Sequence, residues 1–162
     1  MKIKLRTLLF IYLVTIGVAM AASESERLPL SKGMYRMSGT CTKMNHLSFE
    51  ETSNCANRFG INATDPAHPQ FIFSTNGGGA WIFVTSEPAF LTEGGKVATY
   101  PVSSVLDLTV KAAFNYKGEC VLDMKTPDTI ITCTLWKDDS RVKVMWEAQY
   151  KGTGVWQFSK LN

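Results

Sequence analysis

Hydrophobic residues recur at nearly every second position from Lys32 onward, which is the period of a β-strand rather than of a helix. Short segments rich in aromatic and β-branched residues follow one another, and polar residues, glycine or proline separate most of them. These segments are residues 70–74, 80–84, 99–110, 112–116, 120–124, 129–135, 142–150 and 155–159. In residues 142–150, the alternation places Val142, Val144, Trp146 and Ala148 on one face. The pattern predicts an all-β fold, either an antiparallel sandwich or a small barrel.

Three stretches interrupt this pattern. Gly77, Gly78 and Gly79 follow Asn76 between two aromatic segments, which predicts a hairpin turn. A phosphate-binding loop would need a lysine and a following helix, and neither is present here. Residues 50–59 are the best candidate for a short turn or helix, and residues 65–69 are predicted to be a loop because they contain two prolines.

The N-terminus combines basic residues, an apolar run over residues 8–20 and a small-x-small site at residues 19–21. This arrangement is typical of a cleavable secretory signal over residues 1–21. We therefore expect an exported protein, periplasmic or secreted, with a flexible N-terminal arm at residues 22–32 and a single β-rich domain at residues 33–162. No later segment has the length and hydrophobicity that a membrane-spanning helix needs.

Removal of the signal changes the charge of the chain. Three basic residues leave with residues 1–21, so 14 of the 17 basic residues remain against all 14 acidic ones. The resulting neutral balance removes the electrostatic argument for a nucleic-acid partner.

Four cysteines, Cys41, Cys55, Cys120 and Cys133, lie beyond the signal. An even number in an oxidising compartment favours two disulfides, with three possible connectivities. We predict Cys41–Cys55 and Cys120–Cys133, because the latter two would face each other across a hairpin. No pair of cysteines has the close spacing of a zinc or redox motif.

No catalytic motif is visible. The two histidines, His46 and His68, fall short of most catalytic metal sets, and the Asp65–His68 pair lies in the proline-rich loop, so His68 is interpreted as a surface residue. Neither a G-x-S-x-G elbow nor an HExxH motif occurs. Residues 62–64 form a glycosylation sequon, which has meaning only in a eukaryotic secretory pathway. We expect no enzymatic activity, no cofactor and no metal.

Aromatic residues are the remaining signal. The four tryptophans are assigned to the core, because aromatic residues suit packed strands. Phe114, Tyr116 and Tyr150 lie in strands whose neighbours on both faces are large, so we predict that they contribute to an exposed binding surface. Such a surface on a neutral sheet fits a protein partner or an apolar ligand.

Several segments follow one another in the chain: GTC and NC, then PQFIFST with AWIFV, then YPVSSVLDL, then GECVLDM with ITC. This pattern resembles small exported bacterial proteins of unknown function with two cysteine pairs. The resemblance implies export and a β-rich fold. Our first hypothesis is a non-enzymatic protein-binding protein, acting as an inhibitor or accessory factor. The alternatives are a lipocalin-like carrier of a small apolar ligand and a small hydrolase that uses carboxylates assembled by the fold.

Overall fold

The computed structural model describes residues 30–47, 49–153 and 156–160. The predicted signal, residues 1–21, lies outside these residues, as do positions 22–29 of the predicted arm. Leu30 belongs to the buried hydrophobic core. The packed part of the chain therefore begins before the boundary predicted at residue 33.

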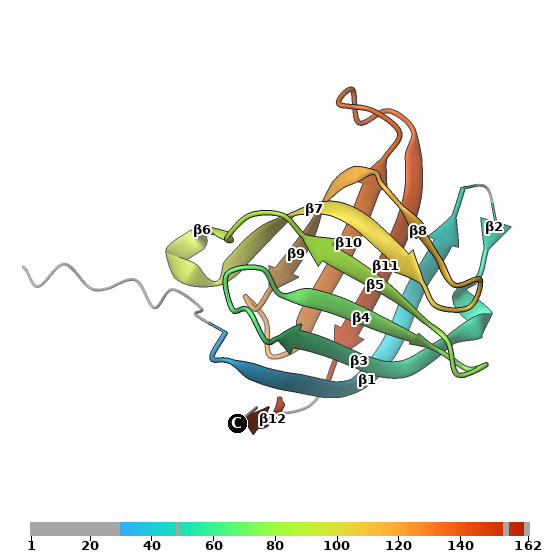
Figure 1. Ribbon diagram of the computed structural model, residues 1–162. Coiled ribbons are helices and arrows are strands. Elements are labelled where there is room, and N and C mark those ends of the chain that lie inside the picture. Colours follow the sequence, from blue (N-terminus) through green and yellow to red (C-terminus); the bar gives the residue numbers. More distant parts are fainter. Residues whose placement is uncertain (1–29, 48, 154–155, 161–162) are drawn as a thin grey trace, which may run out of the picture.

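The described chain consists of strands joined by short connections (Figure 1). The strands are β1 (Gly33–His46), β2 (Phe49–Glu50), β3 (Cys55–Ala63), β4 (Gln70–Thr75), β5 (Ala80–Thr85), β6 (Phe90–Thr92), β7 (Val97–Asp107), β8 (Ala112–Phe114), β9 (Lys117–Asp123), β10 (Thr129–Trp136), β11 (Val144–Gly152) and β12 (Gln157–Lys160). Two 3-10 turns accompany them, η1 (Thr52–Asn54) and η2 (Glu93–Gly95).

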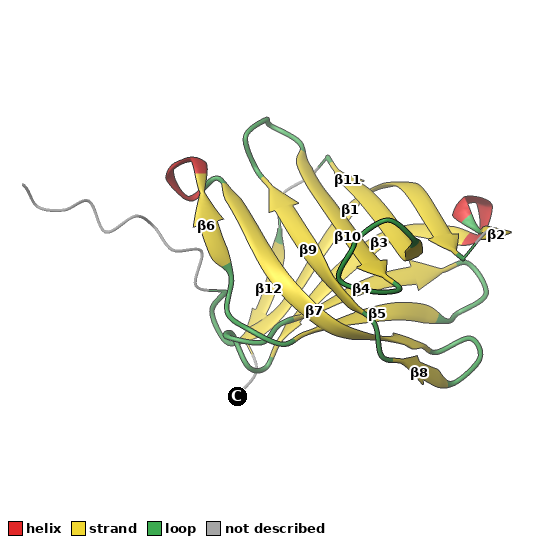
Figure 2. Cartoon of the chain, turned by 90° about the horizontal axis from the view of Figure 1, so that it is seen from above, coloured by secondary structure: helices red, strands yellow, loops and turns green. Residues whose placement is uncertain are grey.

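Eight of the strands form a closed antiparallel barrel. β1, β3, β4, β5, β7, β9, β10 and β11 pair in this order, and β11 pairs with β1 to complete the circle (Figure 2). The short strands β2, β6, β8 and β12 are added to β1 or β7. The all-β prediction is confirmed, and of its two alternatives the barrel is correct.

β1 closes the barrel because it is long enough to have different partners along its length. Its first half, Gly33 to Ser38, pairs with β3, whereas Gly39 to His46 pair with β11. Gly39 is needed at the crossover, since a Cβ there would overlap the backbone of Lys151. A closed sheet of this kind has no long open edge.

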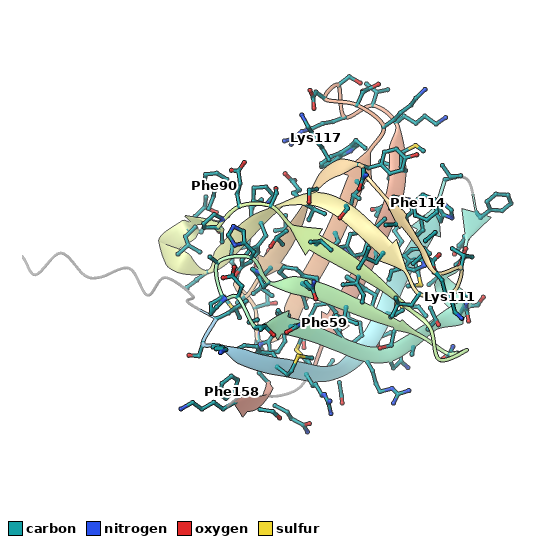
Figure 3. The ribbon with its side chains drawn as sticks, viewed as in Figure 1. Phe59, Phe90, Lys111, Phe114, Lys117 and Phe158 are labelled. Carbon is teal, nitrogen blue, oxygen red and sulfur yellow. A yellow bond between two sulfur atoms is a disulfide. The ribbon has the colours of Figure 1, made fainter. Side chains whose placement is uncertain are left out.

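The inward face of the barrel is packed with aromatic side chains. On β4 and β5 burial alternates, so that Phe71, Phe73, Trp81 and Phe83 are all buried. Phe59 of β3 lies among them, with its ring centroid 5.0 Å from that of Phe73 (Figure 3). This is the packing expected of an eight-stranded barrel whose interior is just wide enough for side chains.

The face predicted for residues 142–150 is correct only in part. Trp146 and Ala148 are buried, but Val142 precedes β11 and Val144 is exposed. The reason is a register shift between Leu135 and Trp136 of β10, where the partner changes from Trp146 directly to Val144. Met145 falls in this irregularity and is buried as well.

Both predicted disulfides are confirmed. Cys120 and Cys133 lie directly opposite each other on β9 and β10, with Cα atoms 4.0 Å apart. Cys41 and Cys55 join β1 to the first residue of β3, with a Cα distance of 6.0 Å. The two bridges therefore fix barrel strands.

The predictions for residues 50–59 and 65–69 have different outcomes. Residues 65–69 form a loop between β3 and β4, as predicted. Only residues 52–54 form a 3-10 turn, and the chain from Cys55 onward is strand β3. A helix is ruled out there because Cys55 pairs with Thr75 and Phe59 with Phe73 across the sheet.

We expect Gly118→Ala to destabilise the barrel by about 1–3 kcal/mol, as overpacking does. A Cβ at Gly118 would overlap the backbone of Thr134 and Leu135 on β10, which cannot move without breaking the strand pairing. Gly77→Ala is the matched control, because a Cβ at Gly77 meets no atom within 4 Å. Urea denaturation of both variants checks this prediction. Equal stability of the two variants would contradict it.

Candidate functional site

Four connections gather at one end of the barrel, on the right and upper side of Figure 1. They join β1 to β3, β4 to β5, β7 to β9 and β10 to β11, and they include β2, η1 and β8. We call this part of the molecule the loop end; it comprises residues 47, 49–54, 76–79, 108–116 and 137–144. β6 and η2 lie at the opposite end (Figure 1).

Large apolar side chains are exposed at the loop end. Phe49 is 66% exposed and Val142 is 84% exposed. The full set of exposed large apolar residues at this end is Leu47, Phe49, Leu108, Val110, Val142 and Val144. Elsewhere in the described chain only Phe90 and Phe158 share this property. Such side chains are scattered singly on ordinary surfaces, so their concentration on three neighbouring connections makes the loop end the candidate site.

Backbone hydrogen bonds link these connections to one another and to the barrel. The N–H of Leu47 donates to Met145 O at 2.7 Å, which joins the first connection to β11. The N–H of Asn76 donates to Asn54 O at 2.8 Å, and that of Leu108 donates to Ala80 O at 2.9 Å. The hydrogen bond of Asn76 thus joins two connections directly, and the other two join a connection to the start of β11 or of β5.

The glycine run forms the β4–β5 connection of the loop end. The predicted hairpin is confirmed, because β4 and β5 pair on either side of it. The positive φ of 83° falls on Gly78 rather than on Asn76 or Gly77. Gly79 has a different role: a Cβ there would lie 2.5 Å from Thr109 Oγ1, so its small size lets the β7–β8 connection approach.

An aromatic cluster fills the barrel beneath the loop end. The rings of His46 and Trp146 are stacked with centroids 3.8 Å apart, and Trp81 meets Trp146 edge-on at 4.5 Å. Phe114 lies 5.2 Å from Trp146 and 5.9 Å from His46. Trp146 is fully buried, and its Nε1 has no hydrogen-bond partner among the described residues. No sequence pattern indicates that His46 belongs to this cluster, because its neighbours come from β5, β8 and β11.

The structure separates the three residues predicted to form a binding surface. Phe114 and Tyr116 are half-buried at the loop end, packed against the core (Figure 3). The prediction for Tyr150 is wrong: its side chain is fully buried, and its hydroxyl donates a hydrogen bond to Met37 O at 3.2 Å. Tyr150 shares the parity of Trp146 and Ala148 along β11, which is the signal that places it inside the barrel.

The β10–β11 hairpin holds Val142 away from the barrel. Arg141 Cζ lies 4.9 Å from the centroid of the Trp136 ring, and Arg141 Nη1 lies 3.5 Å from Glu119 Oε2. The N–H of Lys137 donates to Lys143 O at 2.9 Å across the hairpin. These contacts anchor the hairpin on both sides of Val142.

Polar side chains in two of the exposed loops have local partners. His68 Nδ1 lies 2.8 Å from Asp65 Oδ2 in the exposed loop, and this hydrogen bond is the main reason why the pKa of Asp65 is lowered. The hydroxyl of Ser140 likewise lowers the pKa of Asp138. Within the described ranges, no group of three or more His, Cys, Asp or Glu side chains is arranged to hold a metal ion.

The described part of the chain contains no helix long and apolar enough to cross a membrane. The sequence matches no family model and no curated protein, and the structure matches no solved structure. The fold and the site together define a disulfide-linked, eight-stranded antiparallel barrel with an apolar loop end.

We expect the protein to lose stability between pH 10 and about pH 12. Burial raises the pKa of Tyr150 and of Tyr100 from 10.0 to about 12, so both stay neutral in the folded state where the unfolded chain already ionises. The stability that the two neutral tyrosines contribute is fully present below pH 10, and it is lost as the pH rises through their pKa in the folded state. Tyr150→Phe should show a smaller decrease in the free energy of unfolding between pH 9 and pH 11 than the parent protein. Denaturation at the two pH values measures this decrease. An identical pH dependence of the variant and the parent would contradict the assignment.

Proposed function

We propose that this chain is an exported, non-enzymatic binding protein whose loop end engages a protein partner, as an inhibitor or accessory factor. The observation that supports this proposal is the concentration of exposed apolar side chains on three connections at one end of the barrel. Interfaces between proteins place aromatic and aliphatic side chains at their centre with polar residues around them. Phe114 and Tyr116, half-buried at the same end, extend this surface.

The packed interior favours this function over the carriage of a small apolar ligand. A carrier barrel surrounds its ligand with inward-facing side chains and leaves a cavity of several hundred Å³. Here the corresponding positions are filled by large buried side chains, among them Phe71, Phe73, Phe83, Tyr100 and Tyr150. No specific observation favours the hydrolase alternative.

The loop end carries charges of both signs, which suits a protein rather than a polyanion. Glu50, Glu51, Asp138 and Asp139 lie at the loop end together with Lys111, Lys137, Arg141 and Lys143. A nucleic-acid surface would instead be predominantly basic. The apolar side chains would therefore supply affinity, and the mixed charges would select the partner.

Anchoring of the connections supports tight binding. Surfaces that are already ordered lose less conformational freedom on association. The hydrogen bonds between connections, the Cys41–Cys55 disulfide beside them and the anchored β10–β11 hairpin provide this order. Two disulfides also agree with export to an oxidising compartment.

Site-specific photo-crosslinking tests the proposed surface. A photo-reactive phenylalanine analogue is placed at Phe49 on the loop end or at Phe90 on the opposite end, and the protein is exposed to the exported proteins of its source cells. These positions are matched, because Phe49 is 66% exposed and Phe90 is 60% exposed. We expect one discrete crosslinked protein from position 49 and none from position 90.

Substitutions then measure the contribution of the surface. Phe49→Ser and Val142→Ser should each weaken binding of the crosslinked protein about tenfold, the effect of losing about 1.4 kcal/mol. The melting temperature should be unchanged, because both side chains are exposed. Phe90→Ser serves as the control. Equal crosslinking at both ends, or equal binding by all three variants, would contradict the proposal.

A further inference from the structure

A second surface feature runs along the outer wall of the barrel, over β1, β3 and β4. It is a shallow groove of about 550 Å³. Its walls include the apolar side chains of Met34 and Ile72, and its polar side chains include Arg36, Arg58 and Ser38. Gly78 and Gly79 line it as well, so the groove reaches the loop end.

Gly60 lies in the middle of the groove, opposite Arg36 on β1 and Ile72 on β4. The fold does not require glycine at this position: a Cβ would lie 3.4 Å from Tyr35 O and 3.8 Å from Ile72 Cβ, which are ordinary contacts. Glycine inside a strand weakens it and often marks a place where a ligand approaches the backbone. Gly60 is itself buried, but the absence of a side chain there leaves room at the floor of the groove between Arg36 and Ile72.

Two arginines in the groove have no acidic partner among the described residues. Arg36 is opposite Gly60 and Arg58 is opposite Ser38, so the two arginines are diagonal neighbours on the outward face, a position in which Cα atoms are about 7–8 Å apart. Five other lysines and arginines form ion pairs within the described residues, but Arg36 and Arg58 are not among them. No aspartate or glutamate of the described ranges lines the groove. Two permanent positive charges therefore face a groove with no counter-charge in its wall.

The spacing of the arginines matches an extended acidic peptide. Side chains two residues apart on an extended chain point to the same side and are separated by about 6.8 Å. Carboxylates at positions i and i+2 would therefore meet Arg58 and Arg36 together, and each guanidinium can hold a carboxylate with two hydrogen bonds. An apolar residue further along would contact Met34 or Ile72.

We propose that this groove binds an extended segment of the protein partner with two carboxylates spaced two residues apart, followed by an apolar residue. This inference rests on the proposed function, because it names the chemistry of the partner. The apolar walls favour a peptide over a free phosphate or sulfate ion, which would leave them unused. A groove with two cations is also far smaller than the basic surface that a nucleic acid requires.

Direct titration with a synthetic peptide tests the groove without the partner. The probe is an acetylated, fluorescently labelled peptide with the core Glu-Ser-Glu-Ser-Leu, and its control has Gln in place of both Glu residues. We expect saturable binding of the first peptide, at least about tenfold weaker binding of the second, and loss of affinity with added salt. Equal binding of both peptides, or binding of neither, would overturn the proposal.

Variants assign the binding to the groove. Arg36→Gln and Arg58→Gln should each weaken binding of the acidic peptide about tenfold. Gly60→Val should weaken it similarly by filling the floor, and Lys96→Gln, an exposed cation outside the groove lining, is the matched control. Circular dichroism verifies that each variant is folded. If Arg36→Gln does not fold, the more conservative Arg36→Lys replaces it. Binding that is unaffected by the arginine substitutions would overturn the assignment.

Two further measurements distinguish a partner peptide from other ligands that could occupy the groove. Inorganic phosphate that displaces the peptide at equal concentration would show a simple oxyanion site and overturn the peptide assignment. The chain itself has the same carboxylate spacing at Glu24 and Glu26. Tighter peptide binding after both are changed to Gln would show that they compete for the groove, and would overturn the assignment to a partner.

The photo-crosslinking result distinguishes failure of this inference from failure of the proposed function. A partner crosslinked at position 49 that binds Arg36→Gln and Arg58→Gln as well as it binds the parent would refute only the groove. Peptide binding to the groove without any crosslink at the loop end would refute the proposed loop-end interface.

Discussion

The backbone pairing between β1 and β11 is the interaction on which the rest of the structure depends. Gly39 to His46 of β1 pair with β11, and this ladder converts a meander of eight strands into a closed barrel. Without it, β1 and β11 would be the open edges of a sheet, and the inward aromatic side chains would face water. The Cys41–Cys55 disulfide lies within the paired region of β1 and fixes it to β3.

Closure also determines where function can lie. Trp81, Trp146 and Tyr150 are fully buried inside the barrel, so the interior supplies stability. The proposed recognition would therefore use the outside, where the described surface offers the apolar loop end and the groove that contains Arg36 and Arg58. Gly78 and Gly79 belong to both features, so the two surfaces adjoin each other.

The alternation of hydrophobic residues was sufficient to predict the β fold, and the cysteine spacing was sufficient to predict both disulfides. Barrel closure was not predictable, because it depends on β1 changing partners at Gly39, far in sequence from β11. The prediction for Tyr150 is wrong for a local reason. Its bulky neighbours suggest exposure, but it lies on the same face of β11 as the buried Trp146 and Ala148. His46 and the Arg36–Arg58 pair were missed because their surroundings come from other strands of the sheet, and Val142 was misplaced because of the register shift at Leu135.

Native-state amide hydrogen exchange tests the closed barrel most directly. If the β1–β11 ladder holds the structure together, the paired amides of β1 beyond Gly39 and of β11 should exchange only through global unfolding, as slowly as those of β4 and β5. The amides of the β10–β11 connection should exchange much faster. Exchange of the β1–β11 amides at the rate of that connection, with β4 and β5 still protected, would show an open sheet and contradict the account.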